Sequence, residues 1–572
     1  MKMKMVTGGS CALLIALTTH GHALKAASSC ESLSSLRLPN TSITLAQTVL
    51  AGAFTLPGTG PAVPQFSQLP AFCRVAATLT PSSDSDIKIE VWLPVEAWNG
   101  KFQAVGNGGW AGTISYGALA SALQEGYATA STDTGHVGGN ASFAIGHPEK
   151  VVDFAYRAVH EMAVKSKAII ATFYKRAPRF SYWTGCSTGG RQALMEAQRY
   201  PDDFDGIIAG APANNQTQLC AWRIAVEART LQDPASVVPV AKLALVNRAV
   251  LAACDALDGV TDGLLTDPHQ CHFDPATLLC RGVDRDDCLT ARQVEAVKMG
   301  YAPATRRTGE LIYPGLVPGG ELGWAMLTGA KPEPGGIDVG MFRFVAHEDP
   351  AWDWRTFDLD RDTSLVEKKA GFIDAVDPDL SAFRARRGKL LIYHGWNDGG
   401  SGGAISPQNS VNYYSSVLAR MGPKQEDWLR LFMVPGMAHC GDGPGPNQVN
   451  WMAAMERWRE SGIAPDRLIA SRVSDNRVNM TRPVCPYPQV AQYNGVGSTK
   501  RRGKLRVQVA LISSLNKDVR LWYRVGVQDE NSVRMVGRVE SRAPGAENNA
   551  VTETTFIIRF RGPEALKGQT RN

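Results

Sequence analysis

The feature that most restricts how this chain folds is an alternation of short apolar strands with longer amphipathic helical segments, broken once by a cysteine-bearing stretch. Strands are expected at 87–93, 102–105, 127–131, 180–185, 206–209, 390–393 and 429–434, and helices at 152–174, 189–200, 407–420 and 448–461. Strands and helices that alternate at these lengths are typical of a parallel sheet covered by helices on both faces. The sequence therefore predicts an α/β fold.

The alternation stops after Pro212 and resumes near Lys389. Residues 213–373 contain five cysteines and many prolines and glycines, with little strand pattern. A chain of 572 residues is also too long for a single compact core. We therefore expect one sheet domain, made of residues 24–212 and 374–497, into which residues 213–373 are inserted as a lid.

The C-terminal stretch differs from the rest in charge. Residues 498–572 hold 15 lysines and arginines against 7 acidic residues, whereas the whole chain has a net charge of only +6. The remaining chain is thus slightly acidic, and its charge does not indicate a nucleic-acid partner. The stretch is β-like and lacks cysteine. We interpret residues 498–572 as an atypical basic tail, from a shifted reading frame or a recent fusion, that leaves Cys485 unpaired.

The N-terminus has the pattern of a secretory signal. Lys2 and Lys4 precede a short apolar run, Cys11 to Leu17, and small residues allow cleavage after Ala23. The run is too short to span a bilayer, and no other segment has about 18 uninterrupted apolar residues. We predict a signal peptide over residues 1–23, a secreted or periplasmic protein without a membrane span, and conditions in which disulfides form.

Gly185-Cys186-Ser187-Thr188-Gly189 is a G-x-S-x-G pattern. The pattern alone is weak, because a second copy, Gly399 to Gly403, lies in a glycine-rich loop. The first copy follows an expected strand and opens an expected helix, which is the turn that raises a nucleophilic serine above a sheet edge. We predict Ser187 as a nucleophile; the alternative is an ordinary serine in a tight turn.

A serine nucleophile needs a base, and the base needs a group that orients it. In α/β-hydrolases the chain order is serine, acid, histidine, each just after a strand. Asp398 follows the strand at 390–393, and His439 follows the strand at 429–434. We therefore predict Asp398 as the orienting acid and His439 as the base. Of the other histidines, we interpret His136, His147, His160 and His394 as structural, whereas the rest lie in the signal or the lid.

Cysteines adjoin two of these residues, since Cys186 precedes Ser187 and Cys440 follows His439. If bonded to each other, they would tie the nucleophile directly to the base. The alternative, a reactive Cys186 thiol, is disfavoured because an exported thiol beside Cys440 should oxidise.

Four separate motifs follow one another along the chain: Gly-Cys-Ser-Thr-Gly-Gly-Arg-Gln (185–192), Pro-Asp-Asp-Phe-Asp-Gly-Ile-Ile-Ala-Gly-Ala-Pro-Ala (201–213), His-Gly-Trp-Asn-Asp (394–398) and Pro-Gly-Met-Ala-His-Cys (435–440). Together they resemble the tannase and feruloyl esterase family, which also contains mono-(2-hydroxyethyl) terephthalate hydrolase. Thr-Arg-Pro-Val-Cys-Pro-Tyr-Pro-Gln (481–489) is similar to the family's C-terminal signature. The resemblance spans about residues 28–497 and implies an α/β-hydrolase fold with a large inserted lid.

For the site, the resemblance implies a Ser187–Asp398–His439 triad and a Cys186–Cys440 bond. By position it also implies the pairs Cys30–Cys73, Cys254–Cys271 and Cys280–Cys288. Two backbone amides should form the oxyanion hole, that of Thr188 and that of a glycine within 106–109, and we favour Gly106.

An acidic loop begins at Cys254 and runs Asp255-Ala-Leu-Asp258-Gly-Val260-Thr-Asp262-Gly-Leu264. Oxygen donors without histidine or cysteine in register suit Ca²⁺ rather than Zn²⁺. The spacing alone leaves an acidic loop without metal nearly as plausible. The family resemblance implies structural Ca²⁺, held by the side chains of Asp255, Asp258 and Asp262 and by the carbonyls of Val260 and Leu264.

The resemblance implies a carboxylic ester hydrolase whose substrate is a small aryl ester, alone or attached to plant polysaccharide or polyphenol. We favour feruloyl esters, with galloyl esters or terephthalate monoesters as alternatives. Lid aromatics are candidates to stack the aryl acid: Trp324, Phe342, Phe344, Trp352 and Trp354. Two other classes stay open, a peptidase and a calcium-stabilised binding protein on a hydrolase scaffold, and the second would need none of the triad.

Overall fold

The computed structural model describes residues 28–57, 64–329, 331–399 and 404–493, and the backbone of four further strands at 505–509, 519–529, 532–542 and 551–561. The predicted signal peptide lies outside the described residues. So do residues 400–403, most of the second G-x-S-x-G copy.

A nine-stranded sheet forms the centre of the protein, in the order β1-β2-β3-β5-β4-β6-β7-β10-β11. Its strands are β1 (Thr41–Val49), β2 (Phe72–Leu79), β3 (Ile87–Pro94), β4 (Lys101–Val105), β5 (Ala128–Thr132), β6 (Phe180–Cys186), β7 (Gly206–Gly210), β10 (Lys389–Gly395) and β11 (Leu429–Val434). The strands from β5 to β11 in this order pair in parallel, and β1, β2, β3 and β5 pair antiparallel. The predicted α/β fold is confirmed, and β1 and β2 extend it at one edge.

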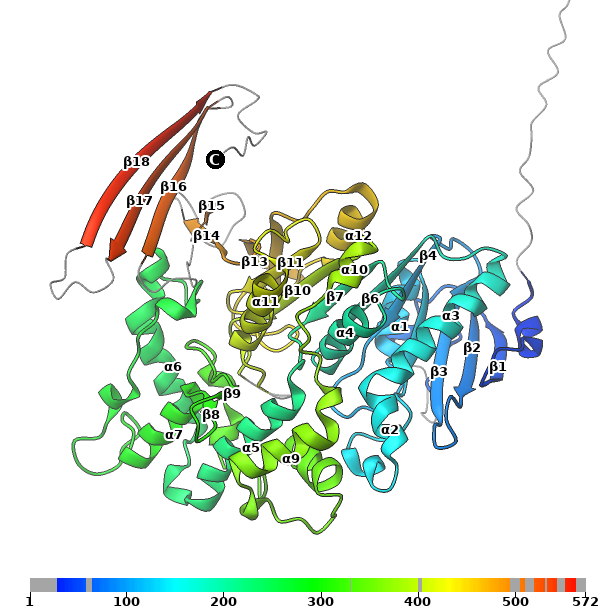
Figure 1. Ribbon diagram of the computed structural model, residues 1–572, viewed down its shortest axis with the longest axis horizontal. Helices are drawn as coiled ribbons and strands as arrows, with labels where there is room; N and C mark the ends of the chain where they lie inside the picture. Colours follow the sequence, from blue (N-terminus) through cyan, green and yellow to red (C-terminus); the bar gives the residue numbers. More distant parts are fainter. Residues whose placement is uncertain are drawn as a thin grey trace, which may run out of the picture.

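Helices cover both faces of this sheet (Figure 1). They are α1 (Tyr116–Gln124), α2 (Pro148–Val152), α3 (Ala158–Tyr174), α4 (Thr188–Arg199), α11 (Pro407–Met421) and α12 (Trp451–Ser461). Successive residues of a strand face opposite layers. Ile207 thus packs in the same core as α3, α4 and α11, whereas Ile208 packs with α12. The helix predicted at 152–174 is interrupted, because residues Asp153–Arg157 form a π-helical turn between α2 and α3.

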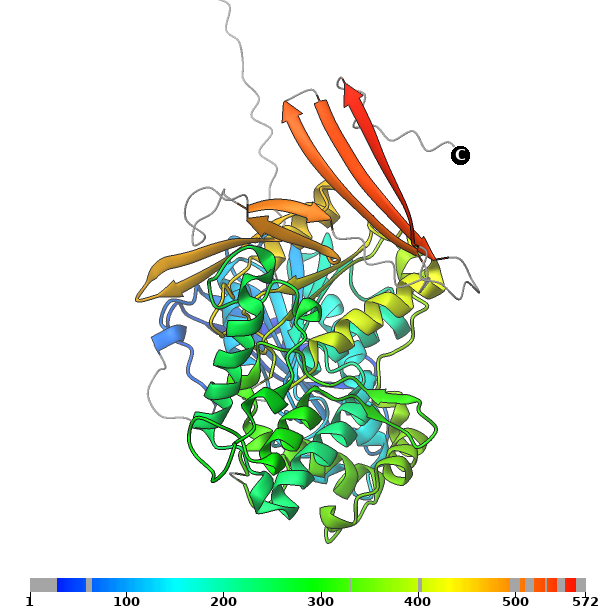
Figure 2. The same cartoon turned by 90° about the vertical axis from the view of Figure 1, so that its left-hand side faces the viewer.

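The segment between β7 and β10 leaves the sheet and returns to it, since β7 and β10 are hydrogen-bonded neighbours. It forms a helical lid with its own apolar core, seen in green in Figures 1 and 2. Its helices are α5 (Gln216–Gln232), α6 (Val240–Cys254), α7 (Ala291–Tyr301), α8 (Gly336–Gly340) and α9 (Leu359–Ala370), with a small hairpin of β8 (Ala304–Thr305) and β9 (Leu311–Tyr313). The short helix α10 (Ser381–Ala385) follows the lid and packs in the core of the sheet through Phe383. Disulfides Cys254–Cys271 and Cys280–Cys288 cross-link the lid, and Cys30–Cys73 secures β2, all as predicted.

Beyond the sheet the chain forms antiparallel strands. β12 (Leu468–Ser474) pairs with β13 (Arg477–Val484), and β14 (Gln489–Tyr493) pairs with β15 (Leu505–Val509). The basic tail contributes β15 and a three-stranded sheet of β16 (Val519–Asp529), β17 (Ser532–Arg542) and β18 (Val551–Arg561). Cys485 carries no disulfide, and neither does Cys220; both are buried.

Among the described helices, none has the length and apolar character needed to cross a bilayer.

Candidate active site

Ser187 occupies a sharp turn between β6 and α4. Its backbone has φ 63° and ψ −122°, a strained conformation that non-glycine residues seldom adopt away from functional sites. The neighbouring glycines are needed because backbones crowd there. A Cβ on Gly185 would lie 2.6 Å from the carbonyl oxygen of Gly189, and a Cβ on Gly189 would lie 3.0 Å from that of Asn107. The G-x-S-x-G pattern therefore reflects close packing of the backbone around a half-buried serine.

Asp398 and His439 meet beyond the carboxyl ends of β10 and β11. His439 Nδ1 donates to Asp398 Oδ2 at 2.6 Å. The Asp398 side chain is completely buried, and that of His439 is 12% exposed. Burial alone would lower the pKa of His439, but the charge and hydrogen bond of Asp398 outweigh it and raise that pKa above its usual value. With Nδ1 engaged, Nε2 is the nitrogen left to act as a base.

The disulfide Cys186–Cys440 brings the serine and the histidine to one place. The two half-cystines are 254 residues apart in the chain, yet their Cα atoms are 5.8 Å apart. Ser187 is one residue from one end of this bridge, and His439 is one residue from the other. The structure thus contains the predicted bond and gathers all three predicted triad residues at one edge of the sheet.

His394 is a member of this site that the sequence analysis missed. Its Nε2 lies 3.0 Å from Asp398 Oδ2, and its Nδ1 lies 2.8 Å from Ser410 Oγ. Its ring is fully buried, at the end of β10. Asp398 Oδ2 therefore contacts two imidazoles. The spacing of four residues between His394 and Asp398 was the one available signal, and it did not show that both side chains turn to the same side.

The predicted oxyanion donors have different outcomes. Thr188 is the first residue of α4, so its amide has no carbonyl one turn back and is free to donate. The prediction that Gly106 is the second donor is wrong, because its amide already donates to the carbonyl of Thr184 at 2.9 Å. Gly106 is glycine for another reason: a Cβ there would lie 2.7 Å from Gly189 Cα.

The next amides along this loop are better candidates. That of Asn107 is engaged with Gln192 Oε1 at 3.1 Å. Within the part of the chain that the structure describes, those of Gly108 and Gly109 have no protein acceptor. Thr188 Oγ1 donates to the carbonyl of Gly109 at 2.9 Å, which holds the loop against the serine turn. We therefore replace Gly106 by Gly108 or Gly109 as the partner of Thr188.

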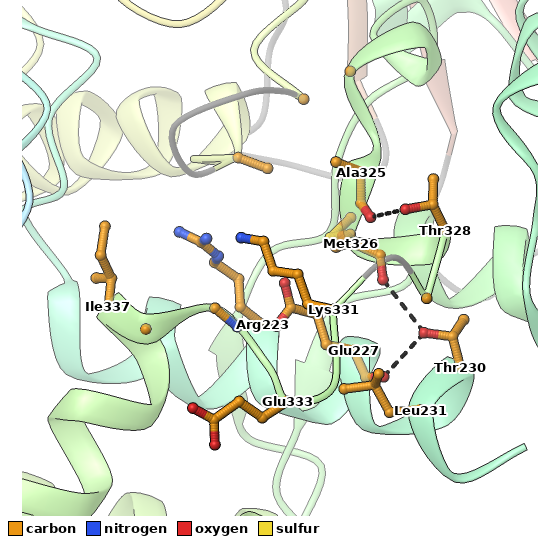
Figure 3. Close-up of a pocket in the computed structure, with 16 residues that line it drawn as sticks. Arg223, Glu227, Thr230, Leu231, Ala325, Met326, Thr328, Lys331, Glu333 and Ile337 are labelled. Atoms are coloured by element: carbon orange, nitrogen blue, oxygen red, sulfur yellow. Dashed lines mark hydrogen bonds between the residues drawn. The ribbon is translucent and has the colours of Figure 1, made fainter.

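Two cavities adjoin these residues and share Gly323 and Ala325. The histidine-side cavity, about 790 Å³, is lined by His439, Asn397 and Ala438 among others. The loop-side cavity, about 430 Å³, is lined by Ile337 and by Gly399, the residue after Asp398 (Figure 3). Ile337 connects this cavity to residues 106–109, which we call the oxyanion loop, because a Cβ on Gly109 would lie 3.3 Å from Ile337 Cδ1.

The predicted stacking aromatics do not line either cavity in the described structure. Phe344 is partly buried against the lid core. The other four are buried within that core: Trp324, Phe342, Trp352 and Trp354. Their apolar surface stabilises the lid, so that prediction is wrong for the structure described. The loop-side cavity is instead lined by glycines, by charged side chains and by the aliphatic side chains of Leu231, Met326 and Ile337, among others.

The acidic loop packs beside the histidine-side cavity. Asp255 Oδ2 accepts the amide of Gly263 at 2.8 Å, Asp258 Oδ1 accepts that of Val260 at 3.0 Å, and Asp262 Oδ2 pairs with Arg482 at 2.5 Å. Asp262 Oδ1 is buried and has no hydrogen-bond partner. Oxygen donors, one of them an unpartnered buried carboxylate oxygen, are of the type that Ca²⁺ takes. Among the described residues, however, no three acidic, histidine or cysteine side chains converge into a metal cluster.

Comparison with known proteins gives one consistent family. A model of the family "Tannase and feruloyl esterase" matches residues 73–504. An uncharacterised esterase of Xanthomonas campestris is 39% identical over 531 residues, covering 83% of this chain and 90% of that protein. A probable feruloyl esterase B-1 of Aspergillus fumigatus is 35% identical, covering 74% and 84%. The crystal structure of feruloyl esterase B from Aspergillus oryzae superposes with a TM-score of 0.78 at 32% identity, covering 84% and 99%.

Proposed function

Because this chain belongs to the tannase and feruloyl esterase family and is a carboxylic ester hydrolase, we propose that it is an exported serine esterase that cleaves aryl carboxylic esters, feruloyl esters above all. The observation that carries the proposal is the disulfide that adjoins both Ser187 and His439, together with the 2.6 Å bond from His439 to Asp398. The relatives named feruloyl esterase support ferulic acid as the acyl part of the substrate.

In the first half of the reaction, Ser187 Oγ attacks the ester carbonyl while His439 Nε2 takes the hydroxyl proton. The carbonyl oxygen becomes an oxyanion and accepts hydrogen bonds from the amide of Thr188 and from one glycine amide of the loop at Gly108 and Gly109. Such donors typically lower a barrier by about 3–4 kcal/mol each. His439 then gives its proton to the departing alcohol oxygen, and the acyl group stays bonded to Ser187.

In the second half, water attacks the acyl carbonyl and His439 takes the water's proton. The bond to Ser187 Oγ breaks, Oγ recovers the proton from His439, and the carboxylic acid leaves. Asp398 keeps Nδ1 of His439 protonated throughout and stabilises the imidazolium that forms twice in the cycle.

We also propose that the acidic loop binds Ca²⁺ in a structural role. Asp255, Asp258 and Asp262 would supply carboxylates, and Val260 and Leu264 carbonyls. Leu264 supports this role, since a Cβ on Gly436 would lie 2.5 Å from its Cδ2. The loop thus packs against the segment that leads to His439, and bound Ca²⁺ would supply fixed positive charge that keeps this support rigid.

The experiment is labelling with a fluorophosphonate followed by peptide mass spectrometry, beside hydrolysis of methyl ferulate, methyl gallate and a terephthalate monoester. We expect label only on the peptide that contains Ser187, and fastest release of ferulate. Ser187→Ala should lose both signals. Label elsewhere, or hydrolysis that survives Ser187→Ala, would contradict the mechanism. Faster hydrolysis of methyl gallate or of the terephthalate monoester than of methyl ferulate would contradict the proposed preference for feruloyl esters.

A further inference from the structure

The two cavities have different chemical surroundings, and these fix how an ester must lie. His439 protonates the departing alcohol, so the alcohol part lies on the side of the histidine-side cavity. The carbonyl oxygen points to the amides of the oxyanion loop. The loop-side cavity then receives the acyl part, because Ile337 lines that cavity and lies beside Gly109 of the oxyanion loop. This assignment rests on the proposed function.

The floor of the loop-side cavity is one face of helix α5. Arg223, Glu227, Thr230 and Leu231 follow one another at helical spacing and all line the cavity. Lys331 approaches from the loop that precedes α8. Figure 3 shows the nitrogen atoms of Arg223 and Lys331 directed to the same space, and Glu227 projects from the next turn of α5.

The Glu227 carboxylate is held in place while one of its oxygens remains available. Its Oε2 accepts the amide of Gly335 at 2.6 Å, and no hydrogen bond to Oε1 is found among the described residues. Thr230 Oγ1 donates to the carbonyl of Glu227 at 3.0 Å and fixes this turn of the helix. Burial and the neighbouring charge of Asp338 raise the pKa of Glu227 to about 7. A carboxylate so placed is an acceptor partly shielded from water.

We propose that Glu227 determines acyl-group specificity, by accepting a hydrogen bond from a ring hydroxyl of the aryl acid while Lys331 and Arg223 lie beside that hydroxyl as donors. The site thus recognises a phenolic acid by its hydroxyl and not by aromatic stacking. This explains why the lid aromatics are absent from the cavity lining in the described structure.

A carboxylate-bearing acyl group fits this cavity less well. Arg223 is already paired with the buried Asp338, with Nη2 and Oδ2 3.2 Å apart. An added carboxylate would therefore face the carboxylate of Glu227, with that of Asp338 behind Arg223. Among the described bases that line the cavity, Lys331 alone has no carboxylate partner. A hydroxyl both donates and accepts, so it satisfies the acid and the bases together. An aryl group without a polar substituent would remove water from these charges and return no hydrogen bond.

The test compares two esters that differ only at the ring hydroxyl, methyl ferulate and its 4-methoxy analogue, methyl 3,4-dimethoxycinnamate. The readout is the ratio of their kcat/KM values, from which the concentration of folded enzyme cancels. We expect the wild type to prefer the hydroxyl by about 10- to 100-fold, in line with the loss of one hydrogen bond to a charged group. Glu227→Gln should reduce this ratio about tenfold, and Lys331→Met should reduce it in the same direction.

Glu333→Gln is the matched control. Glu333 also lines the cavity, but it is paired with Arg343 at 3.0 Å and its carboxylate points away from Arg223 and Lys331 (Figure 3). Its ratio should equal that of the wild type. An unchanged ratio in both Glu227→Gln and Lys331→Met, or an equal change in Glu333→Gln, would overturn the proposal. So would faster cleavage of monomethyl terephthalate than of methyl ferulate by the wild type.

The two proposals fail in different ways. If the wild type cleaves both cinnamates at similar rates and Ser187→Ala cleaves neither, the serine esterase stands and the role of Glu227 is refuted. If the wild type cleaves no aryl ester, or Ser187→Ala stays active, the proposed function itself fails.

Discussion

Cys186 and Cys440 form a disulfide that closes 254 residues of chain, and the nucleophile and the base of the proposed reaction each adjoin one of its ends. The bridge joins the end of β6 to the segment after β11, strands that lie three places apart in the sheet. The same bond therefore affects both the free energy of unfolding and the position of Ser187 relative to His439, and both effects can be measured.

Replacing both cysteines, Cys186→Ala with Cys440→Ala, should lower the free energy of unfolding by roughly 5 kcal/mol from chain entropy. It should also lower kcat, because the covalent link between the segments that carry Ser187 and His439 is then lost. Urea unfolding and steady-state kinetics measure the two effects. The control is Cys280→Ala with Cys288→Ala, which opens a loop of 8 residues in the lid. It should cost roughly 2–3 kcal/mol and leave kcat intact. Equal kcat losses in both double variants would refute the positioning role.

Asp398→Asn should reduce kcat by about 10³- to 10⁴-fold, because the amide favours the wrong tautomer of His439. The pH profile should also move. His439 acts as a base only when neutral, and the charge of Asp398 raises its pKa. Activity of the wild type should thus fall as the pH drops through this raised value. The variant loses that charge, so the acid limb of its kcat/KM profile should lie at lower pH. A limb at unchanged pH would argue against this coupling.

His394 is expected to position Asp398 through its 3.0 Å contact with Oδ2. His394→Phe removes the donor and should lower kcat about 10- to 100-fold with little change in KM. The carboxylate would then be less compensated and would attract the imidazolium of His439 more strongly, so the acid limb should move to higher pH, opposite to Asp398→Asn. His394→Gln retains a donor and should recover part of kcat. A purely structural role predicts that only the melting temperature changes.

Removing Ca²⁺ with a chelator should lower the melting temperature by several degrees, since a ligand at 100 times its Kd adds about 2.7 kcal/mol to stability. Excess Ca²⁺ should restore it. Asp262→Asn and Asp255→Asn should melt at the lower temperature whether or not Ca²⁺ is present. At temperatures well below melting, kcat should stay near that of the untreated protein, because the metal touches no reacting atom. A melting temperature indifferent to both chelator and Ca²⁺ would remove the metal from the proposal.

The sequence by itself determined the features that depend on neighbouring residues. Strands such as 180–185 and 429–434 could be predicted because burial on both faces of a parallel sheet leaves a run of apolar residues. The turn at Ser187 could be predicted because only glycine tolerates the crowding on either side of it. Ser187, Asp398 and His439 each follow a strand of the predicted parallel sheet. Because such strands end at one edge of the sheet, the convergence of the three residues could be inferred without coordinates.

Only the tertiary structure decided the features that depend on which distant atoms meet. The amide of Gly106 donates to the carbonyl of Thr184, and His394 turns to the same carboxylate oxygen as His439. Trp324 packs in the lid core, whereas Glu227 lines the loop-side cavity. A local pattern gives the type of residue and its place on a strand or helix. Whether its donor is free, or its ring is buried, depends on how the folded chain packs around it, and no local pattern encodes that contact.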